Sequence, residues 1–386
     1  MLNVQLYLCL QFNGRMEIMM DNKLNLKKIV YATKACDTVM SQYTIKTLPP
    51  AGVFHYHQGV FLSGMEKVYI NTNIKKYGEY IKSWIDNIVT SSGEILLYDK
   101  TRLDDIQPGI LLFSLYKDTG RDKYKKAIQT LVSNIIDWPR TNEGGFWHKY
   151  CHPNQMWLDE IYMACPFMAR SAVFLGRKEL FDIAITQIEL IQKHLMDEKT
   201  GLLYHAYDHC RQETWSDPET GRSPCVWGRA LAWYLIGTLD TLEYMPKEYK
   251  IKKHIIDNIR KTIDAIVQYQ DTETGLWYQL VNLPNDKNNW IELSSSALFT
   301  YAISKAIRMF YISNRYIKHV NKAYEGIIDH IIVSKNNIII PNICVGTGVG
   351  EYEFYINRPR SENDLHGMGA FILMDVEYAL LKEQLY

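Results

Sequence analysis

The sequence has no long apolar run and no excess of charge of either sign. No stretch of about 18 apolar residues occurs, so we expect no membrane-spanning helix. Lysine plus arginine equals aspartate plus glutamate, at 43 each, so the basic footprint of a nucleic-acid-binding protein is absent. Residues 1–20 have neither a basic start nor an unbroken apolar core, so we expect no signal peptide.

Paired cysteines and nucleotide-binding motifs are also missing. The seven cysteines are odd in number and form no Cys-x-x-Cys pair, a pattern typical of reduced thiols in a cytoplasmic protein. There is no Gly-x-Gly-x-x-Gly, P-loop or Gly-x-Ser-x-Gly motif, and the glycine-rich segment 346–350 lacks a βαβ context. The run YHAYDHC (204–210) matches no common zinc spacing. We therefore expect no cofactor and no metal.

The chain does have ample apolar material and many aromatic residues. It is 47% hydrophobic over 386 residues, enough for a large core. Aromatic residues make up 12%, including 27 tyrosines and 9 tryptophans. Aromatic rings can stack on sugar faces, but in a large helical protein they can equally well fill the core.

A short phrase recurs along the chain, a glycine turn followed by a brief apolar or aromatic strand. A fixed supersecondary unit is the natural cause of such a recurrence. The copies are SSGEILLYD (91–99), NEGGFWHKY (142–150), KTGLLYHAYD (199–208) and ETGLWYQL (273–280), with a weaker copy without glycine, SKNNIII (334–340).

Two kinds of helical pattern alternate around these phrases. An amphipathic helix precedes each phrase, and a helix that is apolar nearly all round follows it, as buried helices are. The amphipathic patterns fall near 26–42, 75–89, 121–137, 178–195, 249–269 and 315–333, and the apolar ones near 58–71, 105–118, 156–175, 226–244, 293–311 and 366–384. Six alternations predict an all-α protein with an (α/α)6 barrel, a six-hairpin toroid with the apolar helices inside. The alternative is an open solenoid of helix pairs.

This barrel would be a single domain over residues 26–386. Residues 1–25 are poorly patterned and are expected to stand outside it. No linker rich in proline, glycine or serine marks a second domain. We expect a monomer or a weak homo-oligomer.

Polar and aromatic residues collect where the inner helices begin. In an (α/α)6 barrel these starts share one rim, and convergent polar groups on a rim predict a small-molecule site. Helix N-termini favour anions, so an anionic sugar would suit this ring. The segments are FHYHQG (54–59), LDDIQPG (103–109), HPNQMWLD (152–159), SPCVWGR (223–229), ELSSS (292–296) and ENDLHG (362–367).

Asp159 is the strongest candidate for catalysis. It stands in the first turn of a helix among apolar neighbours, where desolvation raises the pKa of a carboxyl. Asp104, at the start of the previous inner helix, could add a second charge. A carboxyl kept protonated in this way can act as a general acid. The alternative is an aspartate that only complements the helix dipole.

Further candidates stand on the strand phrases and at the fourth inner helix. His148, Lys149 and His205 would face the same rim, and Trp227 and Arg229 begin the fourth inner helix. Arginine is a good planar partner for a carboxylate, and tryptophan offers a stacking face. Each could alone be a packing residue or a surface charge, but their joint position favours a binding site.

These segments together resemble the unsaturated rhamnogalacturonyl hydrolases of glycoside hydrolase family 105. The resemblance runs from about residue 103 to residue 371. The order and spacing of the motifs are more specific than any single one. The segments that carry it are LDDIQPG, GGFWHK, QMWLDEIYMACPF, LLYHAYD, VWGRALAW and GTGVGEYEFYINRPRSENDLHGMGAF.

The resemblance implies a mechanism without metal or nucleotide. The substrate would be a pectin fragment with a 4,5-unsaturated galacturonyl unit, a small anionic oligosaccharide. The vinyl ether is hydrated: Asp159 protonates C4, water attacks C5, and the hemiketal opens and releases rhamnose. Asp104 would bind substrate hydroxyls and tune Asp159, and Trp157 would pack beside the reacting ring. Contacts with the sugar or its carboxylate are implied for His148, Lys149, His205 and Arg229, and stacking for Trp227.

The transfer is weaker at the first inner helix, where Tyr56 and His57 would join the substrate site. The sequence departs from the family pattern in having Gln107 where asparagine is expected and Glu160 where a small residue is common. Neither change removes a catalytic group, but both leave the exact sugar open.

Three alternatives remain at this stage. An unsaturated glucuronyl hydrolase acting on glycosaminoglycan fragments shares the fold and the chemistry. An N-acylglucosamine 2-epimerase-like isomerase shares the barrel but needs two histidines as acid and base. A catalytically silent sugar-binding protein would show no turnover, whether or not Asp159 is replaced.

Overall fold

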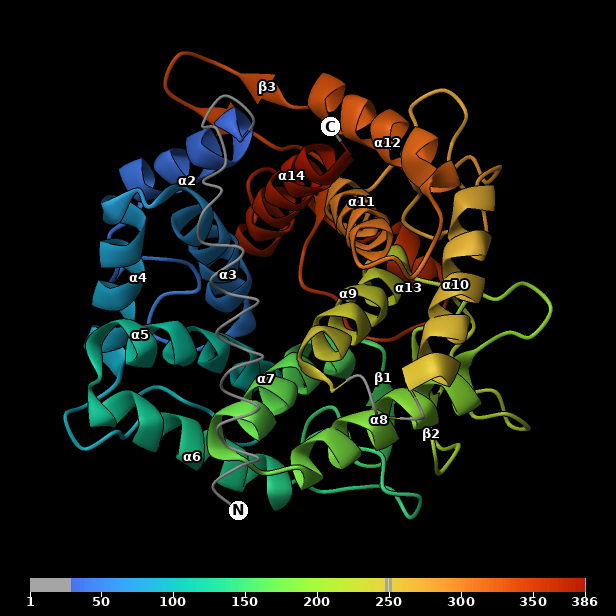
Figure 1. Ribbon diagram of the computed structural model, residues 1–386. Coiled ribbons are helices and arrows are strands. Elements are labelled where there is room, and N and C mark those ends of the chain that lie inside the picture. The colour runs from blue at the N-terminus through green and yellow to red at the C-terminus, as the bar shows by residue number, and fades with distance from the viewer. Residues whose placement is uncertain (1–28, 247–248, 250–251, 386) are drawn as a thin grey trace.

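The computed structural model describes residues 29–246, 249 and 252–385. The segment 1–25, expected to stand outside the barrel, lies outside these residues. Within them the helices form two concentric rings (Figure 1). The inner ring consists of α3 (Tyr56–Thr72), η2 (Leu103–Ile110) with α5 (Leu111–Thr119), α7 (Asp159–Leu175), α9 (Gly228–Tyr244), α11 (Leu293–Arg308) and α14 (Leu365–Leu385). The outer ring consists of α2 (Val30–Gln42), α4 (Lys75–Ile88), α6 (Asp122–Ile136), α8 (Glu179–Leu195), α10 (Lys252–Gln268) and α12 (Ile317–His330).

The inner ring is closed. Each inner helix packs against the next one along the chain, and the last, α14, packs against the first, α3. The predicted (α/α)6 barrel is therefore confirmed, and the open solenoid is wrong. None of the helices in the described ranges combines the length and apolar character needed to cross a bilayer.

The two kinds of helix differ in burial as their sequences predict. In α11 every residue from position 293 to 307 is buried, whereas α4 buries one stripe of its surface. Two glycines allow the inner helices to approach closely. A Cβ at Gly237 of α9 would lie 2.6 Å from the backbone of Tyr162 in α7, and one at Gly369 of α14 would lie 2.6 Å from the backbone of Phe61 in α3.

One inner member departs from the prediction. The continuous helix expected over 105–118 is a 3-10 helix, η2, followed by the α-helix α5. Pro108 lies inside η2 and has no N–H to donate to an α-helical ladder, which favours the tighter form in short segments.

The recurring phrases are turns more than strands. Their glycines share positive φ angles, 89° at Gly93, 98° at Gly144, 78° at Gly201 and 75° at Gly275, a conformation that other residues rarely adopt. Most of the expected strands are single bridges, such as Val89 with Ile95, because each phrase turns back into the next helix within a few residues.

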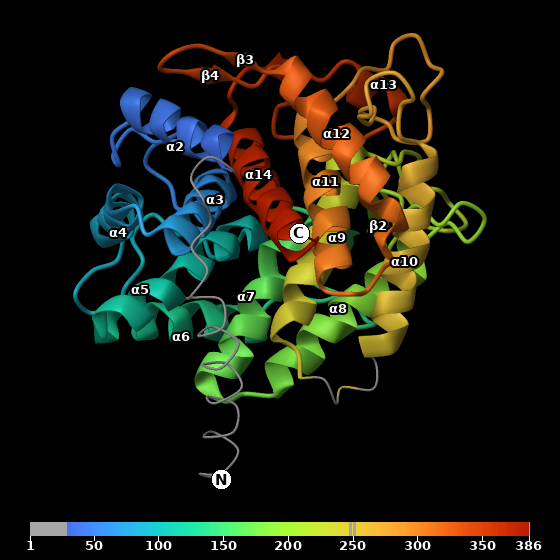
Figure 2. The ribbon, with the colours of Figure 1, turned by 45° about the horizontal axis from the view of Figure 1, so that its top comes forward.

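Three short antiparallel pairs complete the described structure. They are β1 (Gln155–Trp157) with β2 (Ala206–Asp208), β3 (Ile332–Val333) with β4 (Ile338–Ile339), and β5 (Ile343–Cys344) with β6 (Arg360–Ser361). The β3–β4 hairpin lies beside α2 (Figure 2). The remaining helices are η3 (Asn314–Tyr316) and α13 (Tyr352–Ile356).

Candidate active site

The starts of the inner helices meet at one end of the barrel, as their side-chain contacts show. Asp159 begins α7 and contacts His205, which precedes α9. Arg229 at the start of α9 pairs with Glu292 at the start of α11, and His57 in α3 faces the segment before α14. Burial raises the pKa of the Tyr56 phenol. The charges of four rim residues also act on this pKa, namely those of Arg229, Asp104, Asp159 and Asp364. The rim expected from the sequence is therefore a single cluster.

Asp159 is held by a histidine that is itself held by a tyrosine. Its side chain is buried but reaches the surface, with 12% exposed. Nε2 of His205 lies 3.1 Å from Oδ2 of Asp159, and Nδ1 lies 2.7 Å from the hydroxyl of Tyr355 in α13. His205 is fully buried, so these are the partners that fix its ring.

The hydrogen bonds around Tyr355 assign the histidine tautomer. The Tyr355 oxygen accepts a hydrogen bond from the Gly350 N–H, and burial raises the pKa of this phenol well above its usual value. The phenol therefore stays protonated and donates to Nδ1 of His205. A neutral imidazole carries one N–H, which is then on Nε2 and points at Asp159.

Asp104 pairs with two residues of the phrase that follows it, at 142–150. Nζ of Lys149 lies 2.9 Å from its Oδ2, and Nε2 of His148 lies 3.6 Å from its Oδ1. Burial opposes ionisation, but Lys149 and His148 together hold the pKa of Asp104 well below its usual range. Asp104 is therefore a carboxylate, and Lys149 compensates the charge that was expected to act on Asp159.

The two tryptophans of the rim are packed among these histidines. The Trp157 ring stacks on His148 at 4.0 Å between centroids and meets His205 edge-on at 5.5 Å. Trp227 lies 4.8 Å from His205 and donates from its indole nitrogen to Gln279. Trp227 is only 1% exposed, so its main contact in this structure is with protein.

The guanidinium of Arg229 has more protein partners than the sequence indicated. Its guanidinium donates to the backbone carbonyls of Cys344 at 2.5 Å and Val345 at 2.7 Å, and lies 3.7 Å from Glu292. With 1% of the side chain exposed, Arg229 holds the glycine-rich loop that follows β5. Its charge can still act on the rim.

A further group lies between α3 and α14. Nε2 of His57 lies 3.7 Å from Oδ1 of Asp364, and Nδ1 of His366 lies 2.7 Å from the same oxygen. Burial lowers the pKa of both histidines, which favours neutral imidazoles. These three residues could hold a metal ion, because one ligand atom from each lies within 4.8 Å of the others.

Several residues of this rim were not predicted as site residues, among them Glu292, Tyr355, Asp364 and His366. The segment ENDLHG, which contains the last two, was recognised as one of the six helix starts and as part of the family resemblance, but no role was predicted for Asp364 or His366. Tyr355 also lies in a segment that carries the resemblance, but its partner His205 is 150 positions away in the chain, so the sequence did not indicate their contact.

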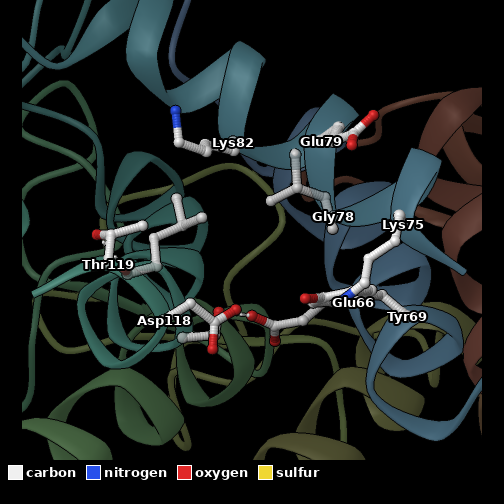
Figure 3. Close-up of a pocket in the computed structure, with 11 residues that line it drawn as sticks. Glu66, Tyr69, Lys75, Gly78, Glu79, Lys82, Asp118 and Thr119 are labelled. Carbon is white, nitrogen blue, oxygen red and sulfur yellow. Dashed lines mark hydrogen bonds between the residues drawn. The ribbon is translucent and has the colours of Figure 1, made fainter. Parts of the chain in front are cut away.

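A separate hollow of about 160 Å³ lies at the other end of the inner helices α3 and α5, against α4 (Figure 3). Its wall includes Glu66, Lys75 and Asp118, which are near the ends of their helices opposite to the rim. None of the predicted site residues lines it, so we do not assign the chemistry to this hollow.

Comparison with known proteins agrees with the fold. Residues 31–382 match the profile of Glycosyl Hydrolase Family 88. A solved structure of a family 105 glycoside hydrolase from C. acetobutylicum ATCC 824 is 34% identical, and the match covers 90% of this chain and 99% of that chain, with a TM-score of 0.86.

More distant relatives share the architecture. Unsaturated rhamnogalacturonyl hydrolase YesR of Bacillus subtilis (strain 168) is 24% identical over 94% of this chain and 100% of its own length. The unsaturated glucuronyl hydrolase of Bacillus sp. GL1 is 13% identical, with a TM-score of 0.64 over 83% of this chain and 85% of its own. The latter likeness concerns the fold alone.

Proposed function

The chain belongs to the glycosyl hydrolases of families 88 and 105 and is an unsaturated uronyl hydrolase; we propose that it releases 4,5-unsaturated galacturonyl units from rhamnose in pectin-derived fragments. Membership in these families argues against the isomerase alternative. The relative named as a rhamnogalacturonyl hydrolase matches nearly the whole chain, which favours rhamnogalacturonan over glycosaminoglycan fragments.

The observation that carries the proposal is the geometry of Asp159. The N–H of His205 binds Oδ2, so the carboxyl is fixed in one orientation and Oδ1 is left for the substrate. In its protonated form Asp159 gives its proton to C4, and positive charge develops at C5. Water then adds to C5 and returns a proton to Asp159. The ring of this hemiketal opens to a ketone at C5, which leaves a hemiacetal at C1. The hemiacetal breaks down to an aldehyde and free rhamnose, so the net co-reactant is one water molecule.

The remaining rim residues would bind and orient the sugar. Asp104 is ionised and can accept hydrogen bonds from sugar hydroxyls, while Lys149 holds it in place. His148 and Trp157 form a stacked wall beside Asp159, and Tyr56 and His57 would contact the substrate from α3. Arg229 would contribute the charge of its guanidinium, and Trp227 would help to shape the rim.

The test replaces Asp159 by asparagine. Asp159→Asn keeps the size of the side chain but has no proton to donate, so turnover should fall by a factor of about 10² to 10⁴ while binding persists. Turnover is measured as loss of the absorbance of the double bond, and binding by calorimetry. A variant with the wild-type rate would remove Asp159 from the reaction.

Glu160→Gln is the matched control, because Glu160 is the next residue of the same helix and is fully buried. Burial raises the pKa of Glu160 well above its usual value. Glutamine therefore resembles the neutral acid already present, and this variant should keep the wild-type rate.

The sugar is tested with paired disaccharides, unsaturated galacturonyl–rhamnose and an unsaturated glycosaminoglycan disaccharide. We expect the higher kcat/KM for the first. A preference for the second would instead identify a glucuronyl hydrolase, and binding without turnover of either would identify a silent sugar-binding protein. The cytoplasmic location and the monomer or weak homo-oligomer expected from the sequence remain predictions.

A further inference from the structure

Two histidines and one aspartate converge where the ring of inner helices closes. His57 stands in the first turn of α3, Asp364 comes directly before α14, and His366 stands in the first turn of α14. One ligand atom from each lies within 4.8 Å of the others, and Oδ1 of Asp364 is shared between both imidazoles.

His366 gives an independent reason to look for a ligand. Its side chain is fully buried, and Nε2 has no hydrogen-bond partner among the described residues. Nδ1 lies 2.7 Å from Oδ1 of Asp364 and pairs with that carboxylate. Buried polar groups are rarely left without a partner, as Nε2 is here.

The surroundings of His57 also fit a metal ligand. Its Nδ1 lies 3.0 Å from Nδ1 of His55, and Nε2 of His55 lies 4.0 Å from Oδ1 of Asp105. A histidine that binds a metal through one nitrogen usually makes a hydrogen bond with the other, which fixes the ring. In His57 this leaves Nε2, the nitrogen nearer to Asp364, available for an ion.

We propose that His57, Asp364 and His366 form a binding site for a divalent transition-metal ion such as Zn²⁺. Two imidazole nitrogens and one carboxylate oxygen suit zinc and its neighbours, whereas Ca²⁺ and Mg²⁺ prefer oxygen ligands alone. Three protein ligands leave a further coordination position for water. The ion would join α3 to α14. His57 also belongs to the proposed substrate site, so the ion would lie at the edge of that site, but its binding does not depend on the proposed hydrolysis.

The charges around the site permit a cation. Arg229 is the opposing charge, since it acts on Asp364 and His366. Glu292 lies 3.7 Å from Arg229 and compensates it, and Asp364 supplies a negative charge at the site itself. The group is therefore not an uncompensated positive cluster.

Cobalt titration tests the proposal on the full chain. Purified protein is treated with a chelator and titrated with Co²⁺, whose visible d–d bands report nitrogen and oxygen ligation. We expect one equivalent of Co²⁺ to bind and to be displaced by Zn²⁺. His57→Ala and His366→Ala should each weaken binding by at least tenfold, while His254→Ala, at an exposed histidine of α10, should leave it unchanged.

Three outcomes would overturn the proposal. These are the absence of saturable binding in the wild type, unchanged binding in the His57 and His366 variants, and a cobalt spectrum dominated by thiolate ligands. His57→Ala guards against a folding artefact, because the His57 side chain is partly exposed whereas that of His366 is fully buried. Circular dichroism confirms that each variant is folded. Because the readout is spectroscopic, it is independent of whether Asp159 performs the proposed reaction.

Discussion

Tyr355 is the residue that links the orientation of Asp159 to a distant segment of the chain. It is fully buried in α13, and among the described residues its hydroxyl makes hydrogen bonds with Nδ1 of His205 and with the N–H of Gly350. If this bond sets the tautomer of His205, then Tyr355 positions the acid without touching the substrate.

Tyr355→Phe should therefore lower kcat with little effect on KM. Removing the hydroxyl leaves Nδ1 of His205 without its donor, so the imidazole can adopt the tautomer that turns a lone pair toward Asp159. We expect a fall in kcat of about tenfold, which corresponds to about 1.4 kcal/mol of barrier. Steady-state kinetics on the unsaturated disaccharide give both parameters.

Tyr352→Phe is the control for this prediction, because Tyr352 belongs to the same helix but bonds to Asp286 at the surface. It should leave kcat and KM unchanged. If Tyr355→Phe altered only thermal stability, or raised KM without lowering kcat, the hydroxyl would have a packing role alone.

At the residue scale, the sequence predicts which side chains stand on the rim but not what each one binds. Asp104, Asp159 and Arg229 are adjacent to helix starts, and helix starts can be recognised locally. The partners of a guanidinium or an imidazole depend on segments far apart in the chain. The saturation of Arg229 by the carbonyls after β5, and the bond of His205 to Tyr355, therefore emerge only from the fold.

At the scale of elements, the glycine turns explain the recurrence of the phrase. A turn between an outer and an inner helix needs a positive φ, and glycine adopts it without the steric cost of a Cβ. The alternation of helices was also predictable from local sequence. The spacing of apolar residues shows whether a helix is buried on all sides or on one side. The split of one inner helix into η2 and α5 depends on a single proline and was missed.

Gly275→Ala should destabilise the protein more than Gly120→Ala. Both glycines have positive φ, 75° and 65°, so each substitution should lower the free energy of unfolding by about 1–2 kcal/mol through backbone strain. At Gly275 the new Cβ would also lie 2.6 Å from the carbonyl oxygen of Lys322 in α12, whereas nothing lies within 4 Å at Gly120. We expect an additional loss of about 1–3 kcal/mol from this overlap.

Urea unfolding of the two glycine variants measures the difference. Equal losses would mean that α12 moves away at no cost, so the turn would not fix the distance between the phrase and the outer helix. A larger loss for Gly120→Ala would contradict the steric argument.

At the scale of the whole molecule, closure of the ring brings the two ends of the described chain together. The outer helix α2 comes first, yet it packs against the last helix, α14. Asp375 of α14 forms this contact by accepting the N–H of Ala32 at 2.8 Å and the hydroxyl of Tyr324 in α12 at 2.8 Å. The sequence pattern predicts the twelve helices, but it does not show that a carboxyl inside α14 caps the N-terminus of α2.

This buried carboxyl should make the stability of the barrel depend on pH. Burial raises the pKa of Asp375 to about 6, against the opposing effect of its two hydrogen bonds. In the unfolded chain the pKa returns to about 3.9. Since the folded pKa is the higher one, the contribution of Asp375 is complete below about pH 4 and is lost as the pH rises through about 6. The loss should be on the order of 2–3 kcal/mol.

Asp375→Asn removes this titration and so isolates it from other groups. The variant cannot ionise, so its free energy of unfolding should rise relative to that of the wild type between pH 4 and pH 7.5. Asp329→Asn, at an exposed position of α12, should show no such relative change, because its carboxyl is in water in both states. Denaturant unfolding at the two pH values gives the comparison. The difference in unfolding free energy between Asp375→Asn and the wild type could instead stay constant with pH. That result would mean that water reaches the carboxyl where α14 meets α2. The contact between the ends of the described chain would then be looser than its hydrogen bonds indicate.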